Sequence, residues 1–267
     1  MTAIKRPFLG ALLLGGVLMS CSSESEVVPG NTGKLKVSVE APSGFATRSV
    51  SEDDYRVAAN YTVEVKDNEG NVKETFKGNS NETLELPIGT YTVTASYGKE
   101  ENASRNTFLC TGSTPVNIGS STDESVTVVC SPTCGKAVVK FDAKMADYYN
   151  DYYVEYSTPA LGSQKVTWAK TDSEPWYLKV GEQGDDVVAT IHLTPKDEYL
   201  TDEQKTAGYS EGVVTQTYNL KRNKAWTMNI KPNYTTSVGE LGISITIDDS
   251  TNDQEVPIIV PAEWIVK

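Results

Sequence analysis

The sequence has few of the residues on which most enzyme chemistry depends. Its 267 residues include one histidine, His192, and four cysteines. No H-E-x-x-H or phosphate-binding loop motif occurs, so the common zinc-protease and nucleotide sites are not indicated. His192 stands between Ile191 and Leu193 in an alternating segment, which predicts a solvent-facing strand residue rather than a catalytic base. These scarcities predict a protein that is not an enzyme and uses no cofactor.

Positive charge is also scarce. Lysine and arginine together number 24 against 36 aspartate and glutamate residues, which gives a net charge of −12. Such an acidic chain is a poor match for nucleic acid or for an anionic lipid surface. No second hydrophobic run of about 20 residues follows the N-terminal one, so the rest of the chain contains no candidate spanning helix.

The N-terminal segment MTAIKRPFLGALLLGGVLMSC is the one strongly apolar stretch. It has a basic start, an apolar run and a small residue before the cysteine, which predicts a secretory signal peptide over residues 1–20. The ending LMSC resembles a bacterial lipobox, so Cys21 is the predicted lipidation site. The alternative is a soluble export signal with an incidental cysteine. Residues 21–33 are polar and lack any strand or helix period, which indicates a tether.

Strand patterns occur along the rest of the chain, and helix patterns are almost absent. Apolar and polar residues alternate at 35–41, 61–66, 136–142 and 225–231. Alternation with period two, interrupted by turn residues, is typical of half-buried antiparallel sheets. The predicted fold is all-β, with two tandem sandwiches. The expected boundaries place one sandwich at 34–131 and the other at 132–267.

Two turns and one loop are predicted between these strands. LELPIGTYTVTASYG (84–98) indicates two strands joined at a corner formed by Pro87 and Gly89. DNEGN (67–71) indicates a hairpin turn that needs a left-handed residue. TPKDEYLTDEQKTAG (194–208) fits a long surface loop better than a helix.

The cysteines and acidic loops do not form a recognisable metal site. With Cys21 lipidated, Cys110, Cys130 and Cys134 remain, which leaves open one disulfide with a free thiol or no disulfide. The pair in CSPTC would need two further zinc ligands, and these could come from Cys110 and His192 alone. The acidic turn DNEGN lacks the spacing of an EF-hand calcium loop. No metal site is predicted.

The segment DYYNDYYVEY (147–156) contains five tyrosines. Two adjacent tyrosine pairs on a strand cannot all face inward, so some rings should be exposed. Exposed rings beside carboxylates stack on sugars, whereas the alternative is a tyrosine-rich core of the kind expected for Trp168 and Trp226. The candidate ligand-binding residues are Tyr148, Tyr149, Tyr152 and Tyr153.

Several segments together resemble surface lipoproteins of Bacteroidetes. They are the lipobox, GKLKVSVEA (33–41), LPIGTYTVTASYG (86–98) and CGKAVVKFD (134–142). They are most similar to a largely uncharacterised lipoprotein domain family related in layout to the fimbrillins, the subunits and anchors of type V pili. The L-P-x-G-x-Y-x-V motif is shared with transthyretin-like domains, so the resemblance implies tandem transthyretin-like or Ig-like sandwiches. The acidic residues after Cys21 resemble an export signal, which implies an outer-membrane lipoprotein exposed at the cell surface.

For fimbrillins, the resemblance implies assembly by strand exchange. A protease cuts after an arginine, the first strand leaves, and a strand of the next subunit fills the groove. In this chain the cut would fall at Arg48, and the apolar segment VPIIV (256–260) would be the donor. The alternatives are an ordinary loop arginine or an anchor subunit that keeps its first strand. The pattern DST (249–251) also resembles an O-glycosylation signal, which implies modification of Ser250.

The expected function is therefore that of a non-catalytic surface lipoprotein, a fimbrillin-like structural or adhesive subunit. Its expected partners are the outer membrane, through the lipid, and other fimbrial subunits or a host or glycan ligand, but not nucleic acid. The alternative is a glycan-binding surface lipoprotein that uses exposed tyrosine and tryptophan residues.

Overall fold

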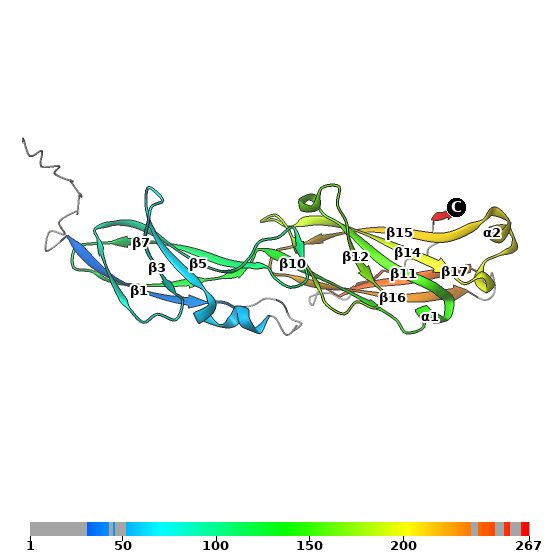
Figure 1. Ribbon diagram of the computed structural model, residues 1–267, viewed down its shortest axis with the longest axis horizontal. Coiled ribbons are helices and arrows are strands. Elements are labelled where there is room, and N and C mark those ends of the chain that lie inside the picture. The colour runs from blue at the N-terminus through cyan, green and yellow to red at the C-terminus, as the bar shows by residue number, and fades with distance from the viewer. Residues whose placement is uncertain are drawn as a thin grey trace, which may run out of the picture.

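The computed structural model describes residues 31–42, 45, 52–235, 240–248, 254–256 and 263–266. The molecule is elongated, with two β-sandwiches arranged end to end (Figure 1). The start of β1 lies at one end, and α1 and α2 lie at the other. The predicted all-β fold with tandem sandwiches is confirmed.

The N-terminal sandwich consists of one three-stranded and one five-stranded sheet. In spatial order the first sheet contains β4 (Thr83–Pro87), β1 (Thr32–Glu40) and β8 (Asp123–Val129). The second contains β3 (Val72–Lys77), β2 (Thr62–Asp67), β5 (Gly89–Gly98), β7 (Leu109–Ile118) and β9 (Ser131–Pro132). Their inner faces enclose a core built by alternate strand residues such as Leu35, Val63 and Val93, which are fully buried.

The C-terminal sandwich consists of a six-stranded and a five-stranded sheet. In spatial order the first contains β18 (Gln254–Val256), β17 (Glu240–Asp248), β16 (Ala225–Thr235), β10 (Cys134–Phe141), β13 (Trp176–Lys179) and β6 (Ala103–Ser104). The second contains β12 (Val166–Ala169), β11 (Tyr149–Ser157), β14 (Asp185–Pro195), β15 (Tyr209–Leu220) and β19 (Glu263–Val266). Trp168, Met228 and Ile191 lie in the core between them.

Most strand pairs are antiparallel, as predicted, but each sandwich also contains one parallel pair. β1 runs parallel to β8, and β10 runs parallel to β16. In both cases the first strand of a sandwich pairs with a strand from the end of the same half. The alternating pattern could not reveal this, because period two is common to parallel and antiparallel strands.

The described helical segments are short, and none is long and apolar enough to cross a membrane. They are η1 (Asp53–Arg56), η2 (Ala58–Asn60), α1 (Met145–Tyr148), η3 (Pro159–Leu161), η4 (Asp197–Tyr199) and α2 (Asp202–Ala207). The prediction of a loop over 194–208 is wrong, because η4 and α2 lie there. Thr201 and Gln204 form a capping box, and Gly208 ends α2 with φ +76°.

The two halves are joined without a separate linker. β8 ends at Val129, β9 occupies residues 131–132, and β10 begins at Cys134. In addition, β6 leaves the N-terminal half and pairs with β13, with Ser104 opposite Tyr177. Because Tyr177 also packs into the N-terminal core, the two sandwiches share side chains across the seam. A domain division between residues 131 and 132 stays a prediction.

Candidate functional site

The first strand, β1, lies in the centre of its sheet. It pairs antiparallel with β4 from Thr32 to Lys36 and parallel with β8 from Lys34 to Glu40. Backbone hydrogen bonds at both ends fix this register, including Lys34 N–H to the Thr122 carbonyl (2.7 Å) and Cys130 N–H to the Glu40 carbonyl (2.7 Å). β1 is therefore not a loosely attached edge but the strand that holds β4 and β8 together.

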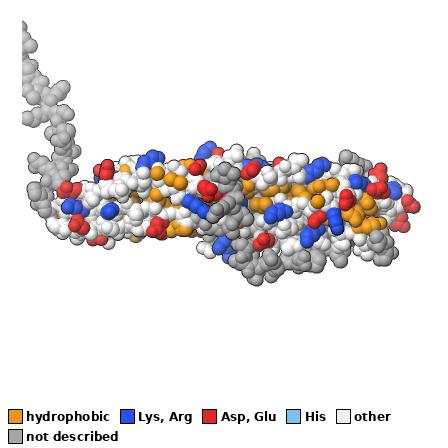
Figure 2. Space-filling view, turned by 90° about the horizontal axis from the view of Figure 1, so that it is seen from below, with side chains coloured by type: hydrophobic (Ala, Val, Ile, Leu, Met, Phe, Trp, Pro, Cys, Tyr) orange, Lys and Arg blue, Asp and Glu red, His pale blue; other side chains and the backbone are white. Residues whose placement is uncertain are grey.

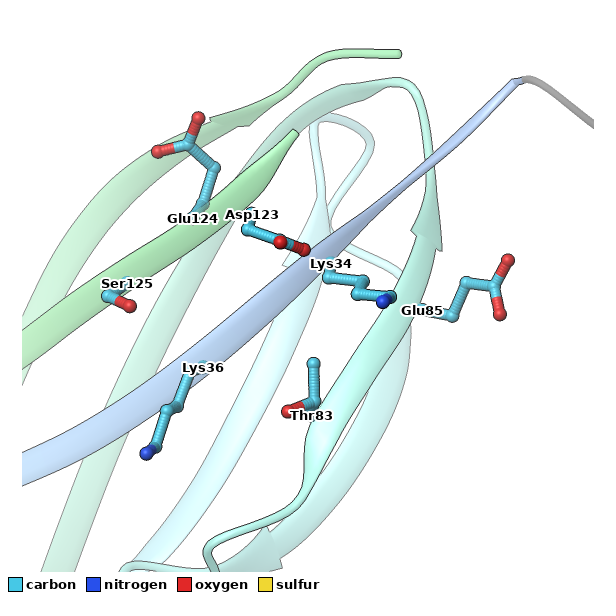
Figure 3. A pocket seen from close by; sticks show the side chains of 7 residues that line it. All are labelled: Lys34, Lys36, Thr83, Glu85, Asp123, Glu124 and Ser125. Carbon is cyan, nitrogen blue, oxygen red and sulfur yellow. The ribbon is translucent and has the colours of Figure 1, made fainter. Parts of the chain in front are cut away.

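The two faces of β1 differ in chemistry. Leu35, Val37 and Val39 point inward and are buried, whereas the residues between them are exposed. On the outer face, Figure 3 shows Lys34 between Glu85 of β4 and Asp123 of β8. These side chains line an open, polar depression of about 370 Å³.

Removal of β1 would open a slot between β4 and β8. The slot would expose the core residues that Leu35, Val37 and Val39 now cover, and burial of each such side chain stabilises a fold by roughly 1.5–3 kcal/mol. It would also leave two rows of unpaired backbone N–H and C=O groups, which favour the entry of another strand. Such a slot would have the two features that strand complementation needs.

The four candidate tyrosines of 147–156 divide into two environments. β11 and β14 change register between Tyr149 and Asp151, which leaves Asn150 as an extra residue. Because such a bulge reverses the side-chain alternation, Tyr149 and Tyr152 both point inward and are buried. The Tyr149 hydroxyl donates to the Gly242 carbonyl at 2.9 Å. These two residues belong to the core.

Tyr153 lies on the outer face of the same sheet, half-buried. Its ring stacks on that of His192 with a centroid separation of 4.4 Å and an interplanar angle of 4°. His192 is also 2.7 Å from Glu211 and 3.3 Å from Glu155, measured from its ring nitrogens to the carboxylates. The prediction of a solvent-facing histidine is therefore only half right, since the residue faces outward but is just 15% exposed.

The charge around His192 is balanced by a lysine. Lys165 Nζ lies 2.7 Å from Glu155, and this contact, assisted by His192, holds the pKa of Glu155 below its ordinary value. Each polar group of the cluster thus has a partner within the same sheet face.

Tyr148 lies at the end of α1 and contacts two residues that the sequence did not single out. Its ring centroid is 4.8 Å from that of Tyr199 and 5.8 Å from that of Tyr234. We refer to Tyr148, Tyr199 and Tyr234 as the distal tyrosine cluster. The three positions are widely separated in sequence, and no spacing rule connects them. The sequence shows only that each of the three residues is aromatic, and it does not indicate that they form a cluster.

The three described cysteines are free and buried. Burial raises the pKa of Cys110 to about 11 and that of Cys130 to about 12, and it raises the pKa of Cys134 further still. Of the two alternatives left open by the sequence, the structure has the one without a disulfide among these residues. Across the described ranges, no three His, Cys, Asp or Glu side chains are grouped to hold a metal ion.

Three predicted sites lie outside the described residues. They are the lipidation site Cys21, the processing site Arg48 and the glycosylation site Ser250. The donor segment 256–260 lies outside them too, apart from Val256 at the end of β18. These assignments stay predictions.

The fold and its central first strand define an all-β protein of two tandem sandwiches. A family model described as "Domain of unknown function (DUF4493)" matches residues 31–262. Since the match covers most of the chain, the chain belongs to this family. No curated protein matches the sequence significantly.

Solved structures similar to the chain include surface proteins of Bacteroidetes. A fimbrial assembly protein from Parabacteroides distasonis is 11% identical, with 85% of this chain and 98% of that one covered and a TM-score of 0.42. A fimbrial anchor protein from Porphyromonas gingivalis is 11% identical, with coverage of 82% and 98% and a TM-score of 0.42. A proposed polysaccharide-binding protein from Bacteroides thetaiotaomicron is 13% identical, with coverage of 84% and 98% and a TM-score of 0.44. These matches agree with the family resemblance found in the sequence.

Proposed function

We propose that the chain is a non-catalytic cell-surface lipoprotein, anchored through Cys21, that serves as a fimbrillin-like structural or adhesive subunit. The observation that carries this proposal is the position of β1 between β4 and β8. Its three inward side chains and its backbone fill a slot that a strand of a second subunit could fill in the same way. The elongated shape, with the start of β1 at one end, suits a subunit stacked along an axis (Figure 1).

The test is treatment of the purified chain with an arginine-specific protease. We expect one cut after Arg48, loss of β1 and the appearance of ladders of oligomers on a denaturing gel. Arg48→Lys is the matched control, because it keeps the charge but removes the cleavage site. A chain that is cut at Arg48 and remains monomeric would refute assembly by strand complementation.

The donor strand is tested separately. Ile258→Asp lies in the apolar segment 256–260, and burial of its carboxylate in an apolar slot would be unfavourable. We expect this variant to be cut at Arg48 as before but to form no ladders. If the cut Ile258→Asp variant forms oligomer ladders as long as those of the unaltered chain, another segment is the donor.

A second candidate function, glycan binding, is favoured by one observation. The distal tyrosine cluster presents half-buried aromatic rings at the end of the molecule opposite the start of β1. With Cys21 anchored, this end would lie farthest from the membrane, where a ligand outside the cell would first be met.

A further inference from the structure

The distal tyrosine cluster is assembled from three separate elements. Tyr148 ends α1, Tyr199 ends η4 and Tyr234 lies near the end of β16. The third ring contact, between Tyr199 and Tyr234, has a centroid separation of 5.3 Å and an interplanar angle of 74°. Each ring is partly exposed and packs against the C-terminal core, so the cluster lies at the border between core and surface.

Backbone hydrogen bonds hold these elements in place. The Asp142 N–H, directly after β10, donates to the Ile230 carbonyl of β16 at 2.8 Å, and the Met145 N–H of α1 donates to the Asp142 carbonyl at 2.9 Å. The Lys196 N–H donates to the Tyr148 carbonyl at 2.9 Å, which ties η4 to the end of α1. The rings are therefore held in their arrangement before any ligand arrives, and such preorganisation lowers the entropic cost of binding.

The polar groups around the rings are available to a ligand. Among the residues that the structure describes, none forms a hydrogen bond with the three phenol oxygens. Desolvation raises the pKa of Tyr199, and the nearby exposed carboxylates of Glu198 and Asp147 add to this shift. Figure 2 shows hydrophobic side chains beside acidic ones at this end of the molecule.

We propose that the distal tyrosine cluster binds an uncharged saccharide. A pyranose ring would stack its C–H face on the outward face of Tyr199, and Asp147 and Glu198 would accept hydrogen bonds from sugar hydroxyls. This inference rests on the second candidate function, glycan binding at this cluster, and adds to it the class of saccharide and the residues that would contact it.

The geometry favours a saccharide over an organic cation. An aromatic cage for a cation needs an open space between its rings. Here the centroids lie 4.8 to 5.8 Å apart, so the rings contact one another and fill that space. A saccharide needs only an outward face. The flanking carboxylates and the net charge of −12 disfavour acidic sugars, which leaves uncharged ones.

The test is calorimetric titration of the purified chain with three uncharged hexasaccharides: cellohexaose, mannohexaose and N-acetylchitohexaose. An alginate hexasaccharide serves as the acidic comparison. We expect at least one uncharged probe to bind and alginate to bind more weakly or not at all. Tyr199→Ala is expected to weaken binding about tenfold, whereas Tyr199→Phe, which keeps the ring, should retain most of the affinity.

Two further variants make the result specific. Tyr153→Ala removes a half-buried tyrosine from the sheet face beside His192 and should leave the affinity unchanged. Glu198→Ala changes an exposed residue that cannot disrupt the core, and it should weaken binding severalfold. Circular dichroism melting curves confirm that each variant is folded.

The inference is overturned if no uncharged hexasaccharide binds, or if folded Tyr199→Ala and Glu198→Ala bind as tightly as the unaltered chain. Either result is distinguishable from failure of the assembly proposal. Protease-induced ladders require the slot left by β1 and not the tyrosines, so Tyr199→Ala should still form them. Ladders without glycan binding would refute this inference alone.

Discussion

Lys136 and Glu52 form an ion pair in the seam between the two sandwiches. The Nζ···Oε1 distance is 2.7 Å, and the side chains are 2% and 1% exposed. Lys136 belongs to β10 of the C-terminal half, whereas Glu52 immediately precedes η1 of the N-terminal half. Tyr177 of β13 donates to the same carboxylate oxygen at 2.9 Å. A charged pair in this position links the two halves through one buried carboxylate.

Lys136→Met is expected to lower the free energy of unfolding by about 3–5 kcal/mol, because it removes one charge of a buried ion pair. Urea denaturation measures this loss. The double variant Glu52→Gln with Lys136→Met removes both charges and should lose clearly less than the single variant. Lys66→Met, which breaks an exposed pair with Glu64, is the control and should cost under about 1 kcal/mol. Equal losses in the single and double variants would contradict this account.

Substitution by phenylalanine should change the stability differently at two buried tyrosines. Tyr149 donates to the Gly242 carbonyl, so Tyr149→Phe is expected to cost about 1 kcal/mol of stability. The Tyr156 hydroxyl is buried without a hydrogen-bond partner in the described part of the chain, so Tyr156→Phe should be neutral or stabilising. Thermal denaturation measures the stability of both variants. If both lose a similar amount of stability, the Tyr156 hydroxyl has a hydrogen-bond partner.

Strands with strict alternation were predictable because one of their faces is buried. The segment 166–169 was predicted within its exact bounds, and β10 and β16 within a few residues. β15 was missed. Its sequence YSEGVVTQTYNL contains many polar residues, although it lies between β14 and β19. Its place in the sheet is set by pairing with neighbouring strands rather than by its own hydrophobic pattern.

The turns were predictable where local chemistry decides them. Gly70 has φ +85°, and Asp67 accepts hydrogen bonds from the Glu69 and Asn71 N–H groups, as the DNEGN pattern predicted. The predicted corner between the two strands is present, but Gly89 does not adopt a positive φ there. The change of direction falls at Ile88, between the end of β4 and the start of β5.

The candidate site was only partly predictable. Alternation alone indicated that the adjacent tyrosines of β11 could not share one face. The bulge at Asn150, which decides which of them are buried, depends on pairing with β14. The contact of Tyr148 with Tyr199 and Tyr234 depends on tertiary structure, because the three residues lie far apart in the sequence and belong to different elements.

The cysteines offer a test of both the fold and the lipid anchor. Cys110, Cys130 and Cys134 are buried and have raised pKa values, so iodoacetamide at pH 8 should not label them in the native protein. In urea all three should be labelled, without prior reduction. Mass spectrometry of the protein isolated from its native membrane should find no label on Cys21, because its thiol would carry the lipid. Labelling of Cys21 in that sample would contradict lipidation.

Arg105 forms a second link across the seam. It follows β6 of the N-terminal half, and its guanidinium lies 2.5 Å from the Asp172 carboxylate of the C-terminal half. The same group donates to the Thr167 carbonyl at 2.9 Å and lies 4.3 Å from the ring centroid of Trp176. A planar, multiply hydrogen-bonded cation of this kind depends on geometry as well as charge.

Arg105→Lys should therefore not be conservative. We expect it to lower the free energy of unfolding by about 1–2 kcal/mol, because lysine keeps the charge but loses the planar fork that stacks on Trp176. The tryptophan fluorescence maximum should shift to longer wavelength as the ring of Trp176 gains contact with water. Lys99→Ala, at a pair whose lysine is 75% exposed, is the matched control and should change neither quantity measurably. If Arg105→Lys leaves both stability and fluorescence unchanged, then charge alone holds β6 against the C-terminal half.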